Sequence, residues 1–274
     1  MAIHDISGFG RCSLTVALPI ISACGIETVC LPTALLSTHT GGIDGYTYHD
    51  LTGDIMPIFN HWASLGLEFD AIYSGFLGSF EQIDLVGKIF DHYRPKGSFI
   101  AVDPVMADNG VLYKIYSPEM AKGMGELCRR ADLIMPNITE ACFILGVDYQ
   151  EPPYDEKYIE DLLKRLAVFG AKQVVLTGVC FDNDHLGAAS FDADDGVVRY
   201  AFTERVEGYF HGTGDVFGSA LVASVLNGKS LADASRIAAE YTCGAIKRTV
   251  AAGSDRRFGV NFEAGLADLA AQAK

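Results

Sequence analysis

The chain has 274 residues, of which 35 are acidic and 21 are basic, so its formal net charge at pH 7 is −14. This charge excludes the basic surface that binds nucleic acid or anionic lipid, and it favours a small-molecule partner. No apolar run reaches the roughly 18 residues of a membrane span, and no basic and apolar leader precedes the first predicted strand, so we expect a cytoplasmic protein.

Short apolar runs rich in β-branched residues alternate with segments of helical period, which is typical of a parallel sheet covered by helices on both faces. We expect strands at Ala2–Ile6, Glu27–Pro32, Asp70–Ser74, Ser98–Asp103, Asp132–Met135 and Lys172–Thr177. We expect helices at Cys12–Cys24, Asp54–Leu65, Glu81–Tyr93, Pro118–Arg130, Thr139–Leu145 and Asp155–Phe169.

After Gly178 the pattern changes to alternation, and Gly187–Phe191 and Val197–Phe202 are predicted to form a hairpin turned by Asp194, Asp195 and Gly196. Two helices, Asp215–Leu226 and Leu231–Thr249, are expected to follow. No internal repeat or Pro/Ser-rich linker interrupts the chain. We therefore predict one α/β domain over residues 1–274.

A glycine turn at the start of the first of these two helices is the strongest functional signal. Gly212 and Gly214 permit backbone conformations that set several N–H groups side by side, and Thr213 lies between them. Free N–H groups and the helix dipole favour a phosphate there, and Asp215 would accept a proton from a hydroxyl group that attacks this phosphate. The alternative is an ordinary N-cap Asp after a turn, and these residues alone leave both interpretations open.

Carboxylates follow two predicted strands at the edge where parallel sheets bind ligands. Asp103 ends one strand, and Glu140 lies one turn beyond Asn137 in the next helix. Because the protein is acidic, a bound polyphosphate needs local N–H groups and a cation, and hard oxygen ligands suit magnesium. Capping of turns and helices is the alternative role for Asp103 and Asn137.

Rival motifs are incomplete. Gly8 and Gly10 begin a dinucleotide fingerprint, but Ser13 replaces its third glycine, which disfavours a nicotinamide enzyme. The Gly228-Lys229-Ser230 tail of a P-loop lies between two helices and lacks its leading glycine. No two histidines are spaced for zinc, and the seven cysteines form no C-x-x-C pair, so we interpret the cysteines as reduced and mostly structural.

Taken together, the glycine turn, Asp103-Pro104-Val105-Met106 and Asn137-x-x-Glu140 resemble the ribokinase-like superfamily of small-molecule kinases. Two further segments, residues 37–41 (Ser-Thr-His-Thr-Gly) and 74–79 (Ser-Gly-Phe-Leu-Gly-Ser), are similar to its pyridoxal kinase branch. The resemblance covers residues 3–250. It implies a three-layer sandwich with a mostly parallel sheet and ATP-dependent phosphorylation of the 5′-hydroxymethyl group of pyridoxal, pyridoxine or pyridoxamine.

In this resemblance Asp215 is the base, in contact with the hydroxymethyl group, and Gly212, Thr213 and Gly214 form the anion hole. Magnesium is implied at Asp103 and Glu140. The residues implied to contact ATP are Asn137, Thr177, Thr213 and Tyr116, the last closing over the nucleotide. The residues implied to line the pyridine pocket are Asp5, Cys12, Leu36, His39, Thr40 and Phe76.

Two positions depart from the family pattern, which commonly has serine in place of Asp5 and an aromatic residue in place of Leu36. We expect the Asp5 carboxylate to bond the edge of the ring and to bias the choice among vitamers. A hydroxymethylpyrimidine kinase of thiamine biosynthesis is the alternative function, and a non-catalytic vitamer-binding protein is a remote one. The resemblance also implies a homodimer and stimulation by a monovalent cation such as K⁺.

Overall fold

The computed structural model describes all residues, 1–274, and its core is one nine-stranded sheet in the order β11-β10-β9-β8-β5-β4-β1-β2-β3. The strands of this sheet are β1 (Ala2–Phe9), β2 (Cys30–Thr38), β3 (Tyr48–Asp50), β4 (Ala71–Ser74), β5 (Phe99–Val102), β8 (Leu133–Ile134), β9 (Gln173–Val179), β10 (His185–Asp192) and β11 (Val197–Glu204). Six neighbouring strands pair in parallel, in the spatial order β9-β8-β5-β4-β1-β2. The edge strands β3, β10 and β11 are antiparallel to their neighbours.

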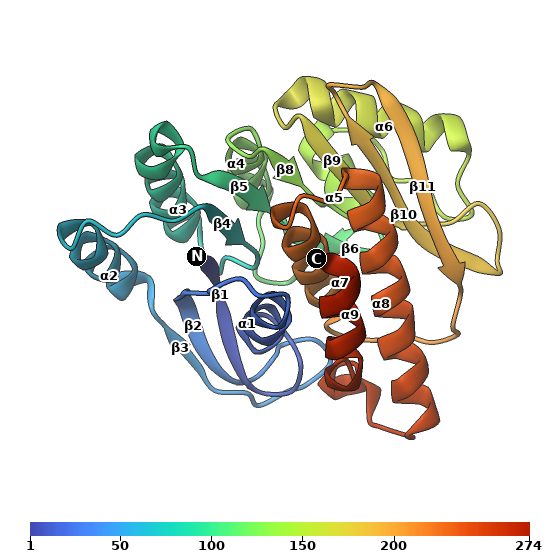
Figure 1. Cartoon of the computed structure of the whole chain (residues 1–274), viewed down its shortest axis with the longest axis horizontal. Coiled ribbons are helices and arrows are strands. Elements are labelled where there is room, and N and C mark those ends of the chain that lie inside the picture. The colour runs from blue at the N-terminus through green and yellow to red at the C-terminus, as the bar shows by residue number, and fades with distance from the viewer.

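Helices cover both faces of the sheet (Figure 1). One face carries α2 (Thr52–Ser64), α3 (Phe80–Tyr93), α4 (Pro118–Cys128), α5 (Ile138–Leu145) and α6 (Glu156–Phe169). The other carries α1 (Leu14–Ala23), α7 (Thr213–Leu226), α8 (Leu231–Ala251) and α9 (Leu266–Ala273). Each layer buries its own apolar cluster against the sheet, which is the main stabilising contribution to this arrangement.

The predicted elements are all present, and the differences lie mainly at their ends. Strand β2 runs to Thr38, six residues further than expected, because Leu35 and Leu36 continue the pairing with β1 and β3. The structure adds elements that the sequence pattern did not indicate. These are β3, α9, the two-stranded hairpin β6 (Ala107–Asp108) and β7 (Val111–Leu112), and 3₁₀ helices at Arg94–Lys96, Arg256–Phe258 and Glu263–Gly265.

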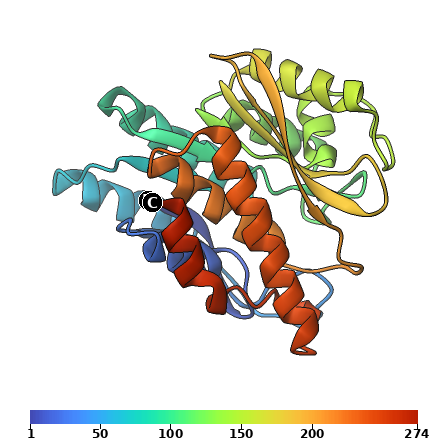
Figure 2. The same ribbon diagram turned by 45° about the vertical axis from the view of Figure 1, so that its right-hand side comes forward.

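The C-terminal third of the chain returns across the sheet, and this return builds the site. Figure 2 shows the long helix α8 running beside the β10–β11 hairpin, with α7 and α9 next to it. Helix α7 packs on α1, so its N-terminus comes close to the carboxyl end of β1. None of the helices is both long and apolar enough to cross a membrane.

Candidate active site

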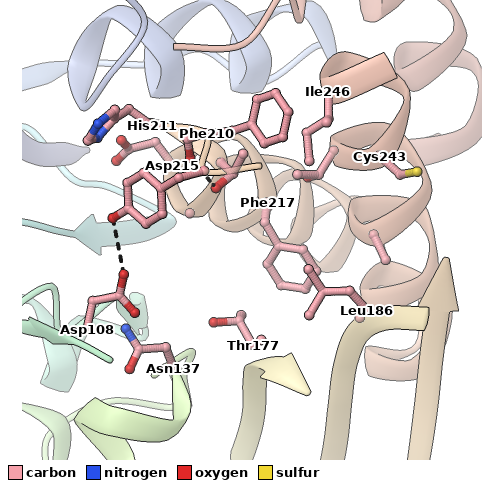
Figure 3. A pocket seen from close by; sticks show the side chains of 18 of the residues that line it. Asp108, Asn137, Thr177, Leu186, Phe210, His211, Asp215, Phe217, Cys243 and Ile246 are labelled. Carbon is pink, nitrogen blue, oxygen red and sulfur yellow. Dashed lines mark hydrogen bonds between the residues drawn. The ribbon is translucent and has the colours of Figure 1, made fainter. Parts of the chain in front are cut away.

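A cavity of about 420 Å³ opens at the carboxyl edge of the parallel strands (Figure 3). Its floor carries Asp103, Asn137 and Thr177. Asp103 follows β5, Asn137 follows β8, and Thr177 lies in β9. The N-terminus of α7 forms one wall. A second part of the wall is largely apolar and comes from β10, α7, α8 and the residue Val206 after β11, with the side chains Leu186, Val206, Phe217, Cys243 and Ile246.

The glycine turn forms the wall that suits an anion. Gly212 has φ 72°, a left-handed conformation, and a Cβ at this position would collide with the carbonyl oxygen of Arg11. The first helical hydrogen bond runs from the Val216 N–H to the Gly212 carbonyl, so the N–H groups of residues 213–215 remain at the open helix start. With the helix dipole, they make a binding site for a phosphoryl group.

Asp215 stands at this helix start as a half-buried carboxyl group that lines the cavity. Burial raises its pKa to about 7, and the negative charge of Asp5 adds to this effect. A hydrogen bond from the Ser13 backbone acts in the opposite direction. A carboxyl group whose pKa lies near neutral pH is well matched to removing a proton from an alcohol as that alcohol reacts.

Asp103 and Glu140 are buried together below the cavity, but only Asp103 presents a carboxylate without a hydrogen-bond partner from the protein. Burial, Glu140 and Asp215 together raise the pKa of Asp103 well above its usual value. Burial likewise raises the pKa of Glu140 to about 8. A divalent cation bound here would supply the positive charge that favours the ionised form of both carboxyl groups.

Glu140 is held by the backbone. Its Oε2 accepts the Asn137 N–H at 2.8 Å and its Oε1 accepts the Met106 N–H at 3.1 Å, while the Asn137 side chain accepts the Glu140 N–H at 2.9 Å. This is a complete capping box. No group of three or more His, Cys, Asp or Glu side chains is arranged to hold a metal. Magnesium therefore fits here only with water and phosphate oxygens among its ligands.

Of the residues implied to contact ATP, Asn137, Thr177 and Thr213 line the cavity and Tyr116 does not. Tyr116 is buried, and its hydroxyl group donates to the Leu77 carbonyl at 2.7 Å, so it supports the β4 loop from below. In this structure Tyr116 therefore does not face the cavity, and its closing over the nucleotide stays a prediction. The Asn137 amide is also engaged, because its Nδ2 donates to the Ala107 carbonyl at 2.8 Å.

The residues implied to bind the pyridine ring lie outside this cavity, around the ends of β1, β2 and β4. Burial raises the pKa of Cys12, and the negative charges of Asp215 and Asp5 add to this effect, so Asp215 adjoins this region as well as the cavity. Leu36 is buried, Thr40 is exposed and Phe76 is half-buried. The contacts of all six residues with the pyridine ring remain predictions.

His39 joins this region to the C-terminal segment. Its Nδ1 accepts the Gly41 N–H at 3.1 Å, so its Nε2 carries the hydrogen and donates to the Arg257 carbonyl. The centroids of the His211 and His39 rings lie 4.7 Å apart. Burial lowers the pKa of His211, and the nearby His39 lowers it further. Both nitrogen atoms of His39 are therefore used by the protein itself.

The hydrogen bond between Tyr209 and Asp108 was not expected from the sequence. The Tyr209 hydroxyl group donates to Asp108 Oδ2 at 3.1 Å, joining the segment before the glycine turn to the β6–β7 hairpin at the cavity (Figure 3). Nothing in the local sequence marks this pair, because 101 residues separate its members. The apolar wall was also missed, since the helical pattern of α8 indicates a buried face without indicating what it faces.

Comparison with known proteins gives consistent results. A family model described as phosphomethylpyrimidine kinase matches residues 18–259. A Bacteroides thetaiotaomicron structure, assigned as a phosphomethylpyrimidine kinase and solved with pyridoxal, is 34% identical, with a TM-score of 0.93 over 98% of this chain and 94% of that one. The pyridoxal kinase of Lactobacillus plantarum is 32% identical, with a TM-score of 0.90 over 98% and 95%. The predicted ribokinase-like fold is thereby confirmed.

Relatives with curated names fall into two groups. The pyridoxine kinase of Bacillus subtilis is 29% identical over 67% of this chain and 66% of its own length, just under two thirds of that enzyme. The hydroxymethylpyrimidine/phosphomethylpyrimidine kinase of the same organism is 28% identical over 81% and 79%. The chain is thus similar both to a kinase named for pyridoxine and to a kinase named for hydroxymethylpyrimidine.

Proposed function

We propose that this chain, which belongs to the phosphomethylpyrimidine kinase family, transfers the γ-phosphoryl group of ATP to the 5′-hydroxymethyl group of a B6 vitamer. The observation that carries the proposal is the placement of Asp215. This carboxyl group, with a pKa of about 7, stands at an open helix start between the cavity and the side chains at the ends of β1 and β2. The similarity to a structure solved with pyridoxal supports the choice of a vitamer.

In the proposed reaction the phosphoryl group binds at the N–H groups of residues 213–215, and the vitamer lies on the β1 side of Asp215. Asp215 accepts the hydroxyl proton as the oxygen attacks phosphorus. The helix start stabilises the negative charge on the transferring group. Magnesium, when bound, neutralises the triphosphate, and Asp103 would hold it directly while Glu140 would act through water.

The apolar wall of the cavity suits the base of the nucleotide. Phe217, Leu186 and Ile246 present apolar surface, and Thr203 and Thr242 add hydroxyl groups near it. Such a mixture is typical of sites for an aromatic heterocycle. We therefore place the adenine between α8 and the β10–β11 hairpin, with its phosphates directed toward Thr177 and the glycine turn.

Phosphorylation of hydroxymethylpyrimidine is the second candidate, because the matched family model and one of the two curated relatives carry that name. Both substrates present a primary alcohol on a small aromatic ring. An enzyme of thiamine biosynthesis would add a second phosphate to its first product, which separates the two functions by mass.

The test is ATP-dependent phosphorylation by the purified protein with magnesium, measured for pyridoxal, pyridoxine, pyridoxamine and hydroxymethylpyrimidine. We expect kcat/KM for the best vitamer to exceed that for hydroxymethylpyrimidine by about tenfold or more, as differential contacts with a ring commonly allow. A doubly phosphorylated pyrimidine product would instead establish the second candidate. Tight vitamer binding without turnover would establish a binding protein.

The proposal also covers the oligomeric state and the cations that the reaction needs. We propose a homodimer, which sedimentation of the purified protein tests. We also propose stimulation by K⁺, for which equal concentrations of K⁺ and Na⁺ at constant ionic strength give the comparison. Chelation of magnesium should abolish turnover, because nothing else at the site neutralises the phosphates and the carboxylates together.

A further inference from the structure

The carboxylate of Asp5 is directed at two serine side chains. Ser13 Oγ donates to Asp5 Oδ1 at 2.6 Å and Ser7 Oγ donates to Asp5 Oδ2 at 3.2 Å. The residue is 4% exposed. The shorter distance is that of a hydroxyl group bonded to a charged oxygen, which is about twice as strong as a neutral hydrogen bond. Both carboxylate oxygens therefore have partners within the protein.

Ser13 has an unusual backbone. Its φ of 56° and ψ of −130° lie in a region that residues with a Cβ rarely adopt, and it is one of two non-glycine residues with positive φ in the chain. Such a conformation persists only where the surroundings hold it. Here the Ser13 carbonyl accepts the N–H groups of Val16 and Ala17 at 3.0 and 2.9 Å, and its side chain is held by Asp5.

This turn packs directly against the glycine turn. A Cβ on Gly212 would collide with the Arg11 carbonyl and would lie 3.3 Å from Cys12 Sγ. The Arg11 N–H in turn donates to the Phe258 carbonyl at 2.9 Å. Burial raises the pKa of Asp215, and the Ser13 backbone beside its carboxyl group acts in the opposite direction. Residues 11–13 thus form the surface against which the start of α7 and its carboxyl group rest.

We propose that Asp5 is a positioning residue that holds Ser13 in its left-handed turn and through Ser13 fixes the place of Asp215. The proposal rests on the function proposed above, since it assigns how the base of that reaction is oriented. A positioning role and a direct contact with the vitamer ring require different properties of the Asp5 side chain. A ring contact needs the negative charge of Asp5, whereas a positioning role needs only an acceptor for the Ser13 hydroxyl group.

Four variants separate these roles. Asp5→Ala and Ser13→Ala both remove the bond, and Ser13→Ala keeps a Cβ in the unfavourable conformation. Asp5→Asn retains an acceptor for Ser13, and its amide group donates to Ser7. Ser13→Gly removes the hydroxyl group, but glycine adopts φ 56° and ψ −130° without strain. Positioning therefore predicts large effects for the two alanine variants and recovery in Asp5→Asn and Ser13→Gly.

The first measurement is structural and does not depend on turnover. In crystal structures of the four variants, we expect residues 11–13 and the Asp215 carboxyl group to shift in Asp5→Ala and Ser13→Ala and to keep their wild-type places in Asp5→Asn and Ser13→Gly. An unmoved Asp215 in both alanine variants would overturn the proposal. If the wild-type protein lacked kinase activity, the proposed reaction would fail, but this structural outcome would still decide whether Asp5 orients Asp215.

The second measurement is steady-state kinetics with each vitamer. We expect kcat to fall by about 10- to 100-fold in both alanine variants, because a small misplacement of a reacting group has effects of that size. KM should change little, and the loss should be equal for the three vitamers. The double variant should lose no more than either single one, because both changes break the same link.

Ser7→Ala is the matched control. It removes a hydroxyl group from the same carboxylate, but Ser7 lies in β1 and its backbone pairs with Leu36. We expect its kcat to stay within about twofold, as for a substitution that breaks one long hydrogen bond. A loss in Asp5→Asn as large as that in Asp5→Ala, and unequal among vitamers, would show that Asp5 acts by charge on the ring.

Discussion

At the scale of single residues, the site places carboxyl groups with different partners close together. Asp5 accepts hydrogen bonds from two serines, Asp103 has no protein partner, and Asp215 lies at the start of α7 beside the Ser13 backbone. Burial raises the pKa of all three groups. We therefore propose a separate role for each carboxyl group: Asp5 orients the Ser13 turn, Asp103 binds the cation, and Asp215 removes the proton.

Replacing the base tests its role most directly. In Asp215→Asn we expect kcat to fall by about 100-fold or more while the affinity for vitamer and nucleotide persists, since only proton removal is lost. Steady-state kinetics and equilibrium binding to the same preparation provide the measurement. Activity within a few-fold of wild type would reduce Asp215 to a helix cap.

His4 supplies a prediction on stability and pH. It is buried beside Tyr73 in edge-to-face contact at 4.5 Å, neither ring nitrogen has a hydrogen-bond partner, and burial lowers its pKa to about 3. The unfolded chain, with the ordinary pKa near 6.5, therefore takes up a proton that the folded chain refuses. This group makes the free energy of unfolding decrease as pH falls from about 6.5 toward 3.

We expect His4→Phe to remove this dependence, so that the variant gains stability relative to wild type as pH is lowered from 7 to 5. Urea unfolding at several pH values measures the difference. His61→Phe, at an exposed position of α2, is the control and should show no such trend. Parallel pH profiles for wild type and His4→Phe would contradict the prediction.

At the scale of elements, helix α5 connects the fold to the metal site. Its capping box uses the carboxylate that we propose as a water-mediated magnesium ligand, and the same carboxylate holds the backbone just before β6. From the sequence alone, residues of this type could serve either in catalysis or in capping. In Glu140 the capping function is present in full, and a role toward magnesium is compatible with it because carboxylate oxygens accept more than one bond.

Glu140→Gln tests both functions together. The amide replaces one oxygen acceptor by a donor that faces a backbone N–H, so we expect a loss of about 1–3 kcal/mol in the free energy of unfolding. We also expect a higher magnesium concentration for half-maximal rate, with vitamer binding unchanged. Ser117→Ala, which removes the N-cap of α4, is the control that lowers stability without altering the magnesium profile.

At the scale of the whole molecule, the two parts of the chain that enclose the cavity are joined by the bond between Tyr209 and Asp108. One part is the strand-and-loop region up to β9, and the other is the return through α7 and α8. An exposed hydrogen bond of this kind adds little to overall stability. Its expected contribution is to the shape of the cavity opening.

Tyr209→Phe should therefore raise KM for ATP about threefold while kcat stays within twofold, since a lost neutral hydrogen bond of about 0.5–1.5 kcal/mol affects binding more than the chemical step. Initial rates at varied ATP concentrations measure it. Tyr113→Phe, at the other tyrosine that lines the cavity, is the matched control. Equal effects of the two substitutions would contradict a specific role for the Tyr209 bond.

The sequence by itself determined the elements and their class. Alternating periods of apolar residues predicted the parallel strands, both helical layers and the β10–β11 hairpin, because burial against a sheet leaves a local repeat in the chain. The glycine turn at Gly212 was equally visible, since a left-handed position next to a helix start requires a residue without a side chain. Short elements such as β3 and the β6–β7 hairpin were missed because they carry too few residues to show a period.

Only the tertiary structure decided which side chains meet. Tyr116 was expected over the nucleotide and lies in the core, while Tyr209 reaches the cavity from a segment with no motif. The partners of Asp5 depend on how the turn at Ser13 folds back on β1. These contacts join residues far apart in the chain or backbone conformations that residue type does not reveal. The approach of the Ser13 turn to the start of α7, for example, follows from the packing of α1 and α7 on one sheet, which local sequence patterns do not encode.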